Sequence, residues 1–373
     1  MTIAIDARVL MNENYSGVSW YAFNLLAALF ELDRENEYVL FYNSKKPVKL
    51  PKFDYPNVSY KGFRFSNKLF NFCLNFFSWP KLDELVGGCD IFFAPNLHFV
   101  SWSDKCRKVI VVHDLSFLAY PNFFNLKQRL WHKLILNKKI LTQADMVIAD
   151  SNSTKKDLED LMNVAPEKIE VAHLGADIKA NGITREEINS KYNLPDKYFL
   201  FVGTIEPRKN LAGVINALNL LLDGVSLAVA GQWGWKNEAE RKMMEGNKRA
   251  VMLGYVSEEE KSALYKYAVA LVYPSFYEGF GLPILEAMKS GCPVIAGNNS
   301  SQGEVSGEAG LLVDPFNINE IKAAMEIMLN NSDLRSEFIK RGYEQAGKFT
   351  WRKTAEQVKA IFEKLGNEKA LPK

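Results

Sequence analysis

The chain has 373 residues, of which 47% are hydrophobic and 24% are charged, so it is long enough for two globular domains. Its formal net charge is only +2, whereas nucleic-acid-binding proteins typically carry a large positive excess, so we expect no nucleic acid among its partners. The four cysteines form no Cys-x-x-Cys pair, which favours reduced, buried thiols over disulfides or a zinc site.

Apolar segments with strand character alternate with longer helical patterns in the first half of the chain. Strands are predicted at residues 3–5, 38–42, 91–94, 109–112 and 146–149. Helices are predicted between them, for example at residues 21–32 and 128–141. The chain begins directly with strand-like residues rather than a signal peptide, and no apolar run reaches the length of a membrane span. We therefore expect a cytoplasmic protein.

The second half repeats this alternation. Its strands are predicted at residues 198–202, 226–230, 270–273 and 293–296, each followed by a glycine or proline turn and a helical pattern. A final helix over residues 351–365 has one continuous apolar stripe. The pattern predicts an α/β protein with two Rossmann-like domains, each with a parallel sheet, joined near residues 175–195. Because such sheets bind ligands beyond the carboxyl ends of their strands, we expect both to face one central cleft.

The segment from Tyr273 to Met288 has the most specific pattern in the chain. Two carboxylates, Glu278 and Glu286, lie eight positions apart, and Gly279 and Gly281 follow the first of them. Glycines allow the backbone to approach a ligand closely. Pro283 suits the first position of a helix, whose N-terminus attracts phosphate. Carboxylates accept hydrogen bonds from sugar hydroxyl groups, so the segment predicts a sugar-nucleotide site.

This Glu-x7-Glu segment resembles the retaining glycosyltransferases of family 4, whose members have the GT-B fold. The resemblance covers most of the chain through further segments at residues 111–114, 149–153, 201–210 and 311–315. It implies an N-terminal acceptor-binding domain over residues 1–178, onto which the C-terminal segment 351–373 crosses back. It also implies a C-terminal domain over residues 179–350 that binds the nucleotide sugar.

The resemblance implies three catalytic residues. Glu278 would contact hydroxyl groups of the donor sugar, Lys209 would neutralise the leaving diphosphate together with Arg208, and His113 would touch the transferred sugar. Glu286 would bind the ribose of the nucleotide. The remaining residues of the predicted substrate site are Gly17, Gly279, Phe280, Gly281 and Leu282.

Structural roles remain open for several of these residues. A lone histidine such as His113 more often lies in a core or caps a loop, and Asp114 fits a cap as well as a catalytic role. Gly17 fits an ordinary loop glycine as well as a contact with the donor phosphate. His98 is expected to be structural, although it fits the acceptor side.

The chain contains no Asp-x-Asp motif and no cluster of residues with metal-ligand spacing. We therefore predict metal-independent catalysis, with a nucleotide-diphosphate sugar as co-substrate and no cofactor. Since no residue stands out as a carboxylate nucleophile, retention of configuration would proceed by front-face attack. The Glu206–Asn210 sequence most resembles mannosyltransferases of polysaccharide assembly, so GDP-mannose is the first donor to test, with a glycan or lipid-linked acceptor.

Two alternative functions are compatible with these motifs. One is a UDP-N-acetylglucosamine 2-epimerase, which would release a free epimerised sugar without an acceptor. The other is a non-catalytic protein that binds sugar nucleotides or glycans.

Residues 61–81 interleave seven phenylalanine and tryptophan residues with lysine and arginine. The aromatic side chains either fill the domain core or, with the neighbouring cations, form a peripheral contact with anionic lipid. In the second case the protein would attach to the inner face of the plasma membrane.

Overall fold

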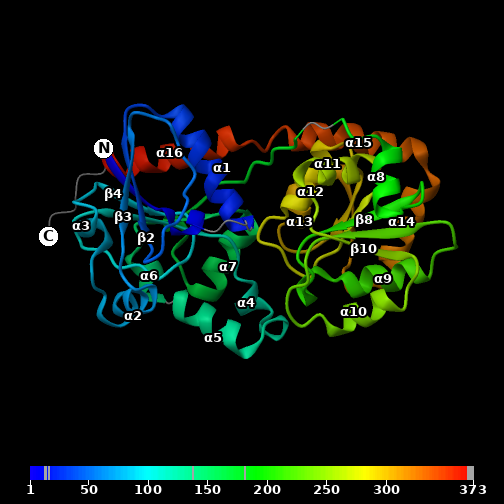
Figure 1. Cartoon of the computed structure of the whole chain (residues 1–373), viewed down its shortest axis with the longest axis horizontal. Helices are drawn as coiled ribbons and strands as arrows, with labels where there is room; N and C mark the ends of the chain where they lie inside the picture. Colours follow the sequence, from blue (N-terminus) through cyan, green and yellow to red (C-terminus); the bar gives the residue numbers. More distant parts are fainter. Residues whose placement is uncertain (12–14, 16, 137, 180–181, 368–373) are drawn as a thin grey trace. The chain divides into compact units, whose positions relative to one another are not determined.

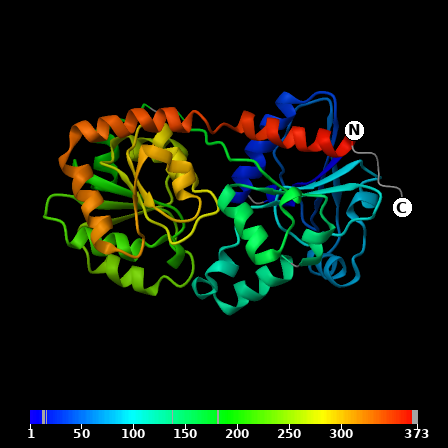
Figure 2. The ribbon, with the colours of Figure 1, turned by 180° about the vertical axis from the view of Figure 1, so that it is seen from behind.

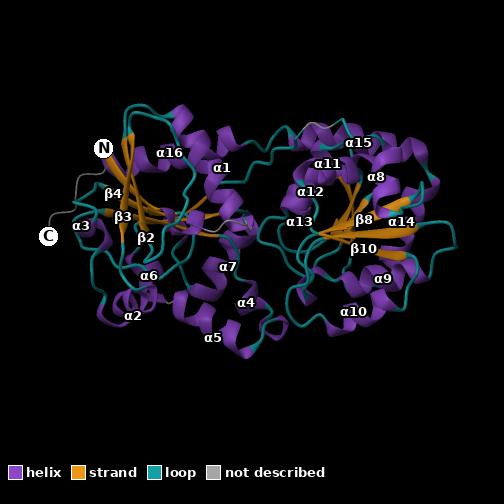
Figure 3. Cartoon of the chain, viewed as in Figure 1, coloured by secondary structure: helices purple, strands orange, loops and turns teal. Residues whose placement is uncertain are grey.

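The computed structural model describes residues 1–373 except 12–14, 16, 137, 180–181 and 368–373. Two compact units are present. The N-terminal unit combines Met1–Leu115, Lys127–Gly175 and Trp351–Lys373, and the C-terminal unit combines Ser116–Leu126 and Ala176–Thr350. Each unit is a sheet with helices packed around it (Figures 1 and 3). The sheets are parallel throughout, which confirms the predicted α/β class.

The N-terminal sheet has seven strands in the order β3-β2-β1-β4-β5-β6-β7. Their bounds are β1 Thr2–Asp6, β2 Glu37–Asn43, β3 Val58–Phe63, β4 Ile91–Ala94, β5 Arg107–Val112, β6 Met146–Ala149 and β7 Ile169–Val171. The four residues of β4 and the four of β6 are all buried, because helices cover both faces of the sheet.

The α-helices of this unit are α1 Gly17–Leu32, α2 Asn67–Phe77, α3 Leu82–Leu85, α5 Leu126–Ile135, α6 Lys138–Gln143, α7 Asn152–Met162 and α16 Trp351–Asn367. A short 3-10 helix, η1 (Ala7–Met11), follows β1. The single helix predicted over residues 128–141 is therefore wrong, because α5 ends at Ile135 and α6 starts at Lys138.

The last helix, α16, packs against α1 at the other end of the sequence, as Figure 2 shows from behind. Its predicted apolar stripe is buried, and the Phe362 ring meets the Phe93 ring of β4 edge to face, with ring centroids 5.3 Å apart. This confirms that the C-terminal helix returns to the N-terminal unit.

The C-terminal sheet has six strands in the order β10-β9-β8-β11-β12-β13. Their bounds are β8 Tyr198–Val202, β9 Ser226–Ala230, β10 Ala250–Gly254, β11 Leu271–Tyr273, β12 Val294–Gly297 and β13 Gly310–Val313. The helices are α4 Ser116–Ala119, α8 Arg185–Tyr192, α9 Leu211–Asn219, α10 Glu238–Glu245, α11 Glu258–Tyr267, α12 Leu282–Lys289, α13 Gln302–Ser306, α14 Ile318–Asn330 and α15 Ser332–Ala346, with the 3-10 helix η4 at Pro207–Lys209. Its core is formed by side chains of β8, β9, α9 and α14.

Three smaller sequence expectations need correction. Pro283 is the second residue of α12 rather than the first, because Leu282 begins the helix. Gly17 begins α1 rather than lying in the preceding loop. Cys73 and Cys89 are only partly buried, whereas Cys106 and Cys292 are buried as predicted.

Candidate active site

The loops after β8 and β11, two neighbouring strands of the C-terminal sheet, bring Arg208, Lys209 and Glu278 together. Arg208 and Lys209 lie in η4, and the next residue, Asn210, has the left-handed conformation (φ 59°). The Asn210 side chain accepts from the Gly213 backbone N–H, which caps α9, and donates to the Pro274 carbonyl 3.1 Å away. Asn210 thus fixes the loop after β8 to the loop after β11.

Glu278 is buried between the two cations. Lys209 Nζ donates to its Oε1 at 2.6 Å, and Arg208 Nη1 donates to its Oε2 at 3.0 Å. Burial alone would raise the pKa of the Glu278 carboxyl, but the charges of Arg208 and Lys209 outweigh burial and lower it to about 2. Glu278 is therefore a carboxylate at neutral pH.

A second buried carboxylate, Glu206, holds Arg208 from the other side. Arg208 Nε and Nη2 both donate to Glu206 Oε1, at 3.0 and 2.6 Å. Burial raises the pKa of Glu206 despite the neighbouring Arg208 and Lys209 charges. Two carboxylates and two cations thus balance in charge within this cluster, which lowers the cost of burying them.

Lys209 also donates to the phenolic oxygen of Tyr273, the last residue of β11. Its ammonium group has three N–H donors, and Tyr273 and Glu278 take two of them. Burial and the nearby Arg208 charge lower the pKa of Lys209, against the attraction of Glu278. A second anion beside Lys209, such as a phosphate, would therefore favour the charged ammonium group.

Side chains just after β12 hold the Glu278 loop in place. The Ser301 hydroxyl donates to the carbonyls of Glu278 and Phe280, at 2.9 and 2.8 Å. The Glu278 N–H donates to the Ser300 hydroxyl at 3.0 Å, and the Gln302 amide donates to the Ser275 carbonyl at 2.8 Å. This backbone is therefore fixed on both sides of the Glu278 side chain.

Gly279, Phe280 and Gly281 connect Glu278 to Leu282 at the start of α12. Gly281 has φ 103°, a conformation that favours glycine, and precedes the first turn of the helix. Phe280 is buried and packs edge to face on Phe349 within the same unit. These residues set the direction in which the loop enters α12.

Glu286, on α12, belongs to a separate network. Its Oε1 accepts from Lys261 Nζ at 2.9 Å and its Oε2 accepts from the Tyr265 hydroxyl at 3.0 Å, both on α11. Lys261 also pairs with Glu258 at 3.0 Å. Each carboxylate oxygen has a further lone pair, so Glu286 can still accept hydroxyl groups while α11 holds it in place.

His113 follows β5 in the N-terminal unit and forms a pair with Asp150. Its Nδ1 lies 2.7 Å from Asp150 Oδ2, and its Nε2 lies 3.1 Å from the Pro95 carbonyl oxygen. Burial would lower the pKa of the imidazole, but the Asp150 carboxylate raises it above its ordinary value. A ring with both nitrogens facing acceptors favours the imidazolium form.

The predicted residues therefore divide among three places. Arg208, Lys209 and Glu278 form one cluster with the segment 279–282, Glu286 lies in a second network, and His113 and the exposed Gly17 lie in the other unit.

Sequence reasoning missed the partners of these residues: Asp150, Glu206, Lys261, Tyr265 and Tyr273. Strand register contains a signal for Asp150. Val112 and Ala149 are paired in neighbouring strands, so the next residues, His113 and Asp150, emerge side by side.

Two family models match most of the chain. Residues 15–180 match "Glycosyltransferase Family 4", and residues 184–345 match "Glycosyl transferases group 1". The O-antigen chain mannosyltransferase B of Escherichia coli is 32% identical over 281 residues, which cover 72% of each chain. The serotype-specific mannosyltransferase WbdA of Escherichia coli is 28% identical over 278 residues, and there the match spans about a third of the relative's length.

Solved structures of similar fold cover nearly the whole chain. Sucrose-phosphate synthase from Thermosynechococcus elongatus has a TM-score of 0.75 at 22% identity, covering 98% of both chains. Anabaena HepE in complex with UDP and glucose has a TM-score of 0.69 at 15% identity, covering 97% of this chain and 99% of that one.

Proposed function

This chain belongs to the glycosyltransferases of family 4, and we propose that it transfers mannose from GDP-mannose to a glycan or lipid-linked saccharide. The observation that carries the proposal is the buried Arg208–Glu278–Lys209 cluster at the carboxyl ends of β8 and β11. The two Escherichia coli relatives are mannosyltransferases, which supports mannose as the sugar.

The cluster has the chemistry that a sugar diphosphate requires. Arg208 and Lys209 hold the Glu278 carboxylate in place, and a carboxylate is the kind of acceptor that binds sugar hydroxyls. The third N–H of Lys209 can donate to a phosphate oxygen. As the bond to the sugar breaks, negative charge grows on the diphosphate, and a fixed cation stabilises that charge.

The same cations support a reaction without a metal ion. In our proposal, Arg208 and Lys209 supply the positive charge that a divalent cation supplies in other sugar-nucleotide enzymes. We also propose retention of configuration by front-face attack, in which the leaving diphosphate accepts the proton of the acceptor hydroxyl. The imidazolium of His113 would contact the transferred sugar, and Glu286 would bind the ribose.

A turnover assay tests this assignment. Purified protein is incubated with GDP-mannose, GDP-glucose and UDP-glucose and a saccharide acceptor, with and without EDTA. We expect release of GDP from GDP-mannose, unchanged by EDTA and reduced at least a hundredfold in Lys209→Ala, since one such electrostatic contact contributes about 10²–10³ in turnover. A requirement for Mn²⁺ or Mg²⁺ would contradict the proposed role of the cations.

We further propose that the acceptor is presented at an anionic membrane surface, through helices α2 and α5. Of the aromatic side chains in residues 61–81, Phe70 is buried in the domain core, whereas those toward the end of the segment are exposed. In the second half of α2, Phe72, Phe76 and Phe77 are exposed, as is Trp79 just after the helix, with exposed fractions of 49% to 68%.

Helix α5 contributes exposed Leu130, Trp131 and Leu134. Lys139 of α6, the helix that follows α5, donates to the Ser78 hydroxyl at the end of α2, so α6 is a neighbour of α2. Figures 1 and 2 show α2 and α5 along the same edge of the N-terminal unit. We call these exposed apolar residues, with Phe72, Phe76, Phe77 and Trp79, the α2–α5 surface.

The two sequence segments that contain the α2–α5 surface have charged residues of a single sign. Neither segment 55–82 nor segment 115–144 contains an aspartate or glutamate, whereas both contain lysine and arginine, including Lys68, Lys81, Lys127 and Arg129. Exposed apolar side chains on segments whose charged residues are all cations are suited to a bilayer with anionic head groups. Among the described residues, no helix is both long and apolar enough to cross a bilayer, so the proposed contact is peripheral.

A further inference from the structure

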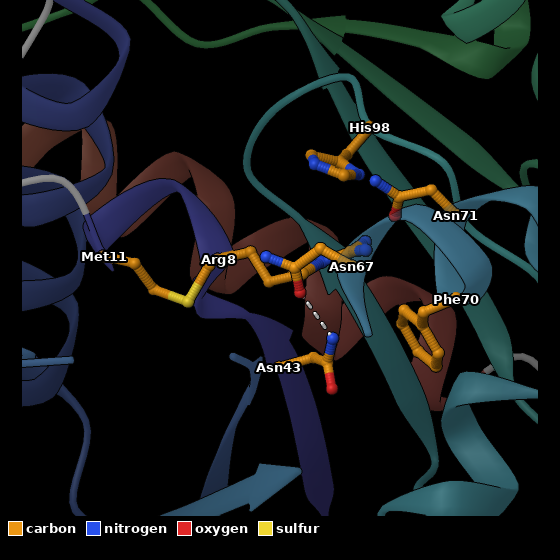
Figure 4. Close-up of a pocket in the computed structure, with 7 residues that line it drawn as sticks. All are labelled: Arg8, Met11, Asn43, Asn67, Phe70, Asn71 and His98. Atoms are coloured by element: carbon orange, nitrogen blue, oxygen red, sulfur yellow. Dashed lines mark hydrogen bonds between the residues drawn. The ribbon is translucent and has the colours of Figure 1, made fainter. Parts of the chain in front are cut away.

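A small cavity lies in the N-terminal unit where β1, β2 and β4 end (Figure 4). Arg8 reaches it from η1 after β1, Asn43 from the end of β2, and His98 from the loop after β4. Asn67 and Asn71, one turn apart on α2, complete its polar lining. The cavity has a volume of about 40 Å³, room for about three water molecules or one hydroxymethyl group.

Two buried polar atoms of residues that line this cavity lack hydrogen-bond partners among the residues that the structure describes. They are Arg8 Nη1 and His98 Nδ1. Arg8 is only 6% exposed, and its other nitrogens are occupied by Asp6 and by the Phe99 carbonyl. An unpaired buried donor or acceptor is costly, so both atoms call for a partner that enters the cavity.

Met11 and Phe70 also line the cavity, and the polar groups beside them carry no excess charge. The Arg8 guanidinium is neutralised by Asp6, with Nε–Oδ1 2.8 Å and Nη2–Oδ2 2.5 Å. Burial, with a contribution from the Arg8 charge, lowers the pKa of His98 to about 4, so its imidazole is neutral at pH 7. Figure 4 shows the Asn71 amide directed toward the His98 ring. Such a lining suits uncharged hydroxyl groups better than a carboxylate or phosphate.

The cavity lies at the carboxyl ends of the strands of the N-terminal sheet, and so does His113. Strand β4 pairs with β5, whose end carries His113. His113 Nε2 faces the carbonyl of Pro95, which begins the short segment leading to His98. The strands that lead to the cavity are one to three places from β5 in the sheet, and neighbouring strands are about 4.8 Å apart, so a saccharide held in the cavity can extend along the strand ends toward His113.

We propose that this cavity is an acceptor subsite that receives a hydroxyl or hydroxymethyl group of the acceptor saccharide. Arg8 Nη1 donates to that group, His98 Nδ1 and the Asn71 amide pair with it, and the rest of the sugar extends toward His113. This assignment rests on the proposed glycosyl transfer, because it identifies which part of the protein holds the acceptor.

The test uses the resonances of the imidazole. The chain has four histidines, so ¹⁵N-histidine labelling gives few signals, and His98 is assigned by comparison with His98→Gln. Methyl α-mannoside is the probe, with inorganic phosphate and acetate as anionic probes. We expect a saturable shift of the His98 signal with methyl α-mannoside alone.

Variants connect the shift to the cavity. Asn71→Ala should weaken methyl α-mannoside binding about three- to tenfold, the effect of one neutral hydrogen bond. Asn75→Ala, one turn further along α2 and outside the cavity, should bind as the wild type does. Arg8→Lys keeps a charge against Asp6 but loses Nη1, and should also weaken binding.

Two outcomes would overturn the subsite. One is a His98 signal that responds to phosphate or acetate but not to the glycoside, and the other is equal binding by Asn71→Ala and Asn75→Ala. Binding of GDP is measured on the same samples. If GDP binds and the glycoside does not, the acceptor subsite alone fails; if the glycoside binds and no nucleotide does, the proposed transfer fails instead.

Discussion

Lys209 and Glu278 form a buried ion pair, with Nζ and Oε1 2.6 Å apart, although 69 positions separate them in the sequence. Both side chains are proposed to act on the donor, so the pair that would bind the ligand also joins the loops after β8 and β11. Removing one partner of a buried pair leaves a buried charge uncompensated, which typically costs about 3–5 kcal/mol. Variants of either residue must therefore be tested for folding as well as for turnover.

Glu278→Gln should be less stable than the wild type by an amount that depends on pH. The folded pKa of about 2 lies below the ordinary 4.5, so the ionised carboxylate stabilises the fold above pH 4.5, and this contribution disappears as pH falls from 4.5 toward 2. The difference in pKa corresponds to about 3 kcal/mol.

Urea unfolding of wild type and Glu278→Gln across that pH range measures the effect. The difference in unfolding free energy should be largest near neutral pH and should shrink below pH 4.5. Glu245 is exposed, so Glu245→Gln is the matched control, and its unfolding free energy should stay close to that of the wild type across the pH range. A gap that stays constant with pH would show that Glu278 is not held ionised by Arg208 and Lys209.

Glu286→Ala should weaken binding of GDP about ten- to hundredfold, because a charged acceptor contributes about 1.5–3 kcal/mol to a hydrogen bond. Isothermal titration with GDP gives the affinity directly. Glu258→Ala is the control, since Glu258 is the other carboxylate partner of Lys261. Equal losses in the two variants would mean that the effect acts through Lys261 rather than through the ribose.

Asp150→Asn should lower the pKa of His113, because the carboxylate that opposes the effect of burial is gone. In the wild type the raised pKa stabilises the fold fully below pH 6.5, and this contribution is lost as pH rises through the folded value. Histidine NMR titration of both proteins measures the shift. His98 serves as an internal control and should titrate near pH 4 in both; an unchanged His113 midpoint would argue against the Asp150 pairing.

The wild-type protein should sediment with vesicles that contain phosphatidylglycerol at low salt and be released at high salt, because salt screens the cationic contribution. The double variant Phe76→Ser and Phe77→Ser should lose this binding while remaining folded. Leu222→Ser removes another highly exposed apolar side chain, in the C-terminal unit, and should bind vesicles normally. If the wild-type protein does not bind anionic vesicles at low salt, the α2–α5 surface is not a membrane contact.

The sequence predicted the interior strands of both sheets and missed the outer ones. Strands β6, β8 and β9 begin and end where the apolar runs predicted, because helices cover both faces of interior strands and demand continuous apolar residues. The four missed strands, β3, β7, β10 and β13, are the edges of the two sheets. All six residues of β3 are at least partly exposed, so its sequence lacks the apolar run that identifies a strand.

The sequence predicted those residues of the candidate site that belong to short motifs. Arg208, Lys209 and Glu278 lie in motifs that follow strands. Because ligands bind beyond the carboxyl ends of parallel strands, residues in such motifs are expected to lie close together there. The charge partner of Glu286 was not predictable from local sequence. Pairing of Glu286 with Lys261 depends on how α11 packs on α12, and packing of two helices has no signature in either helix alone.

The central claim is hexose transfer with retention, and the anomeric configuration of the product tests it most directly. GDP-α-mannose is incubated with the wild-type protein and a mannose-terminated oligosaccharide, and the product is examined by ¹H NMR. We predict an α-mannosidic linkage with one GDP released per bond formed, and loss of both in Glu278→Gln. A β-linked product would contradict retention, and a free epimerised sugar without any new glycosidic bond would contradict the transfer itself.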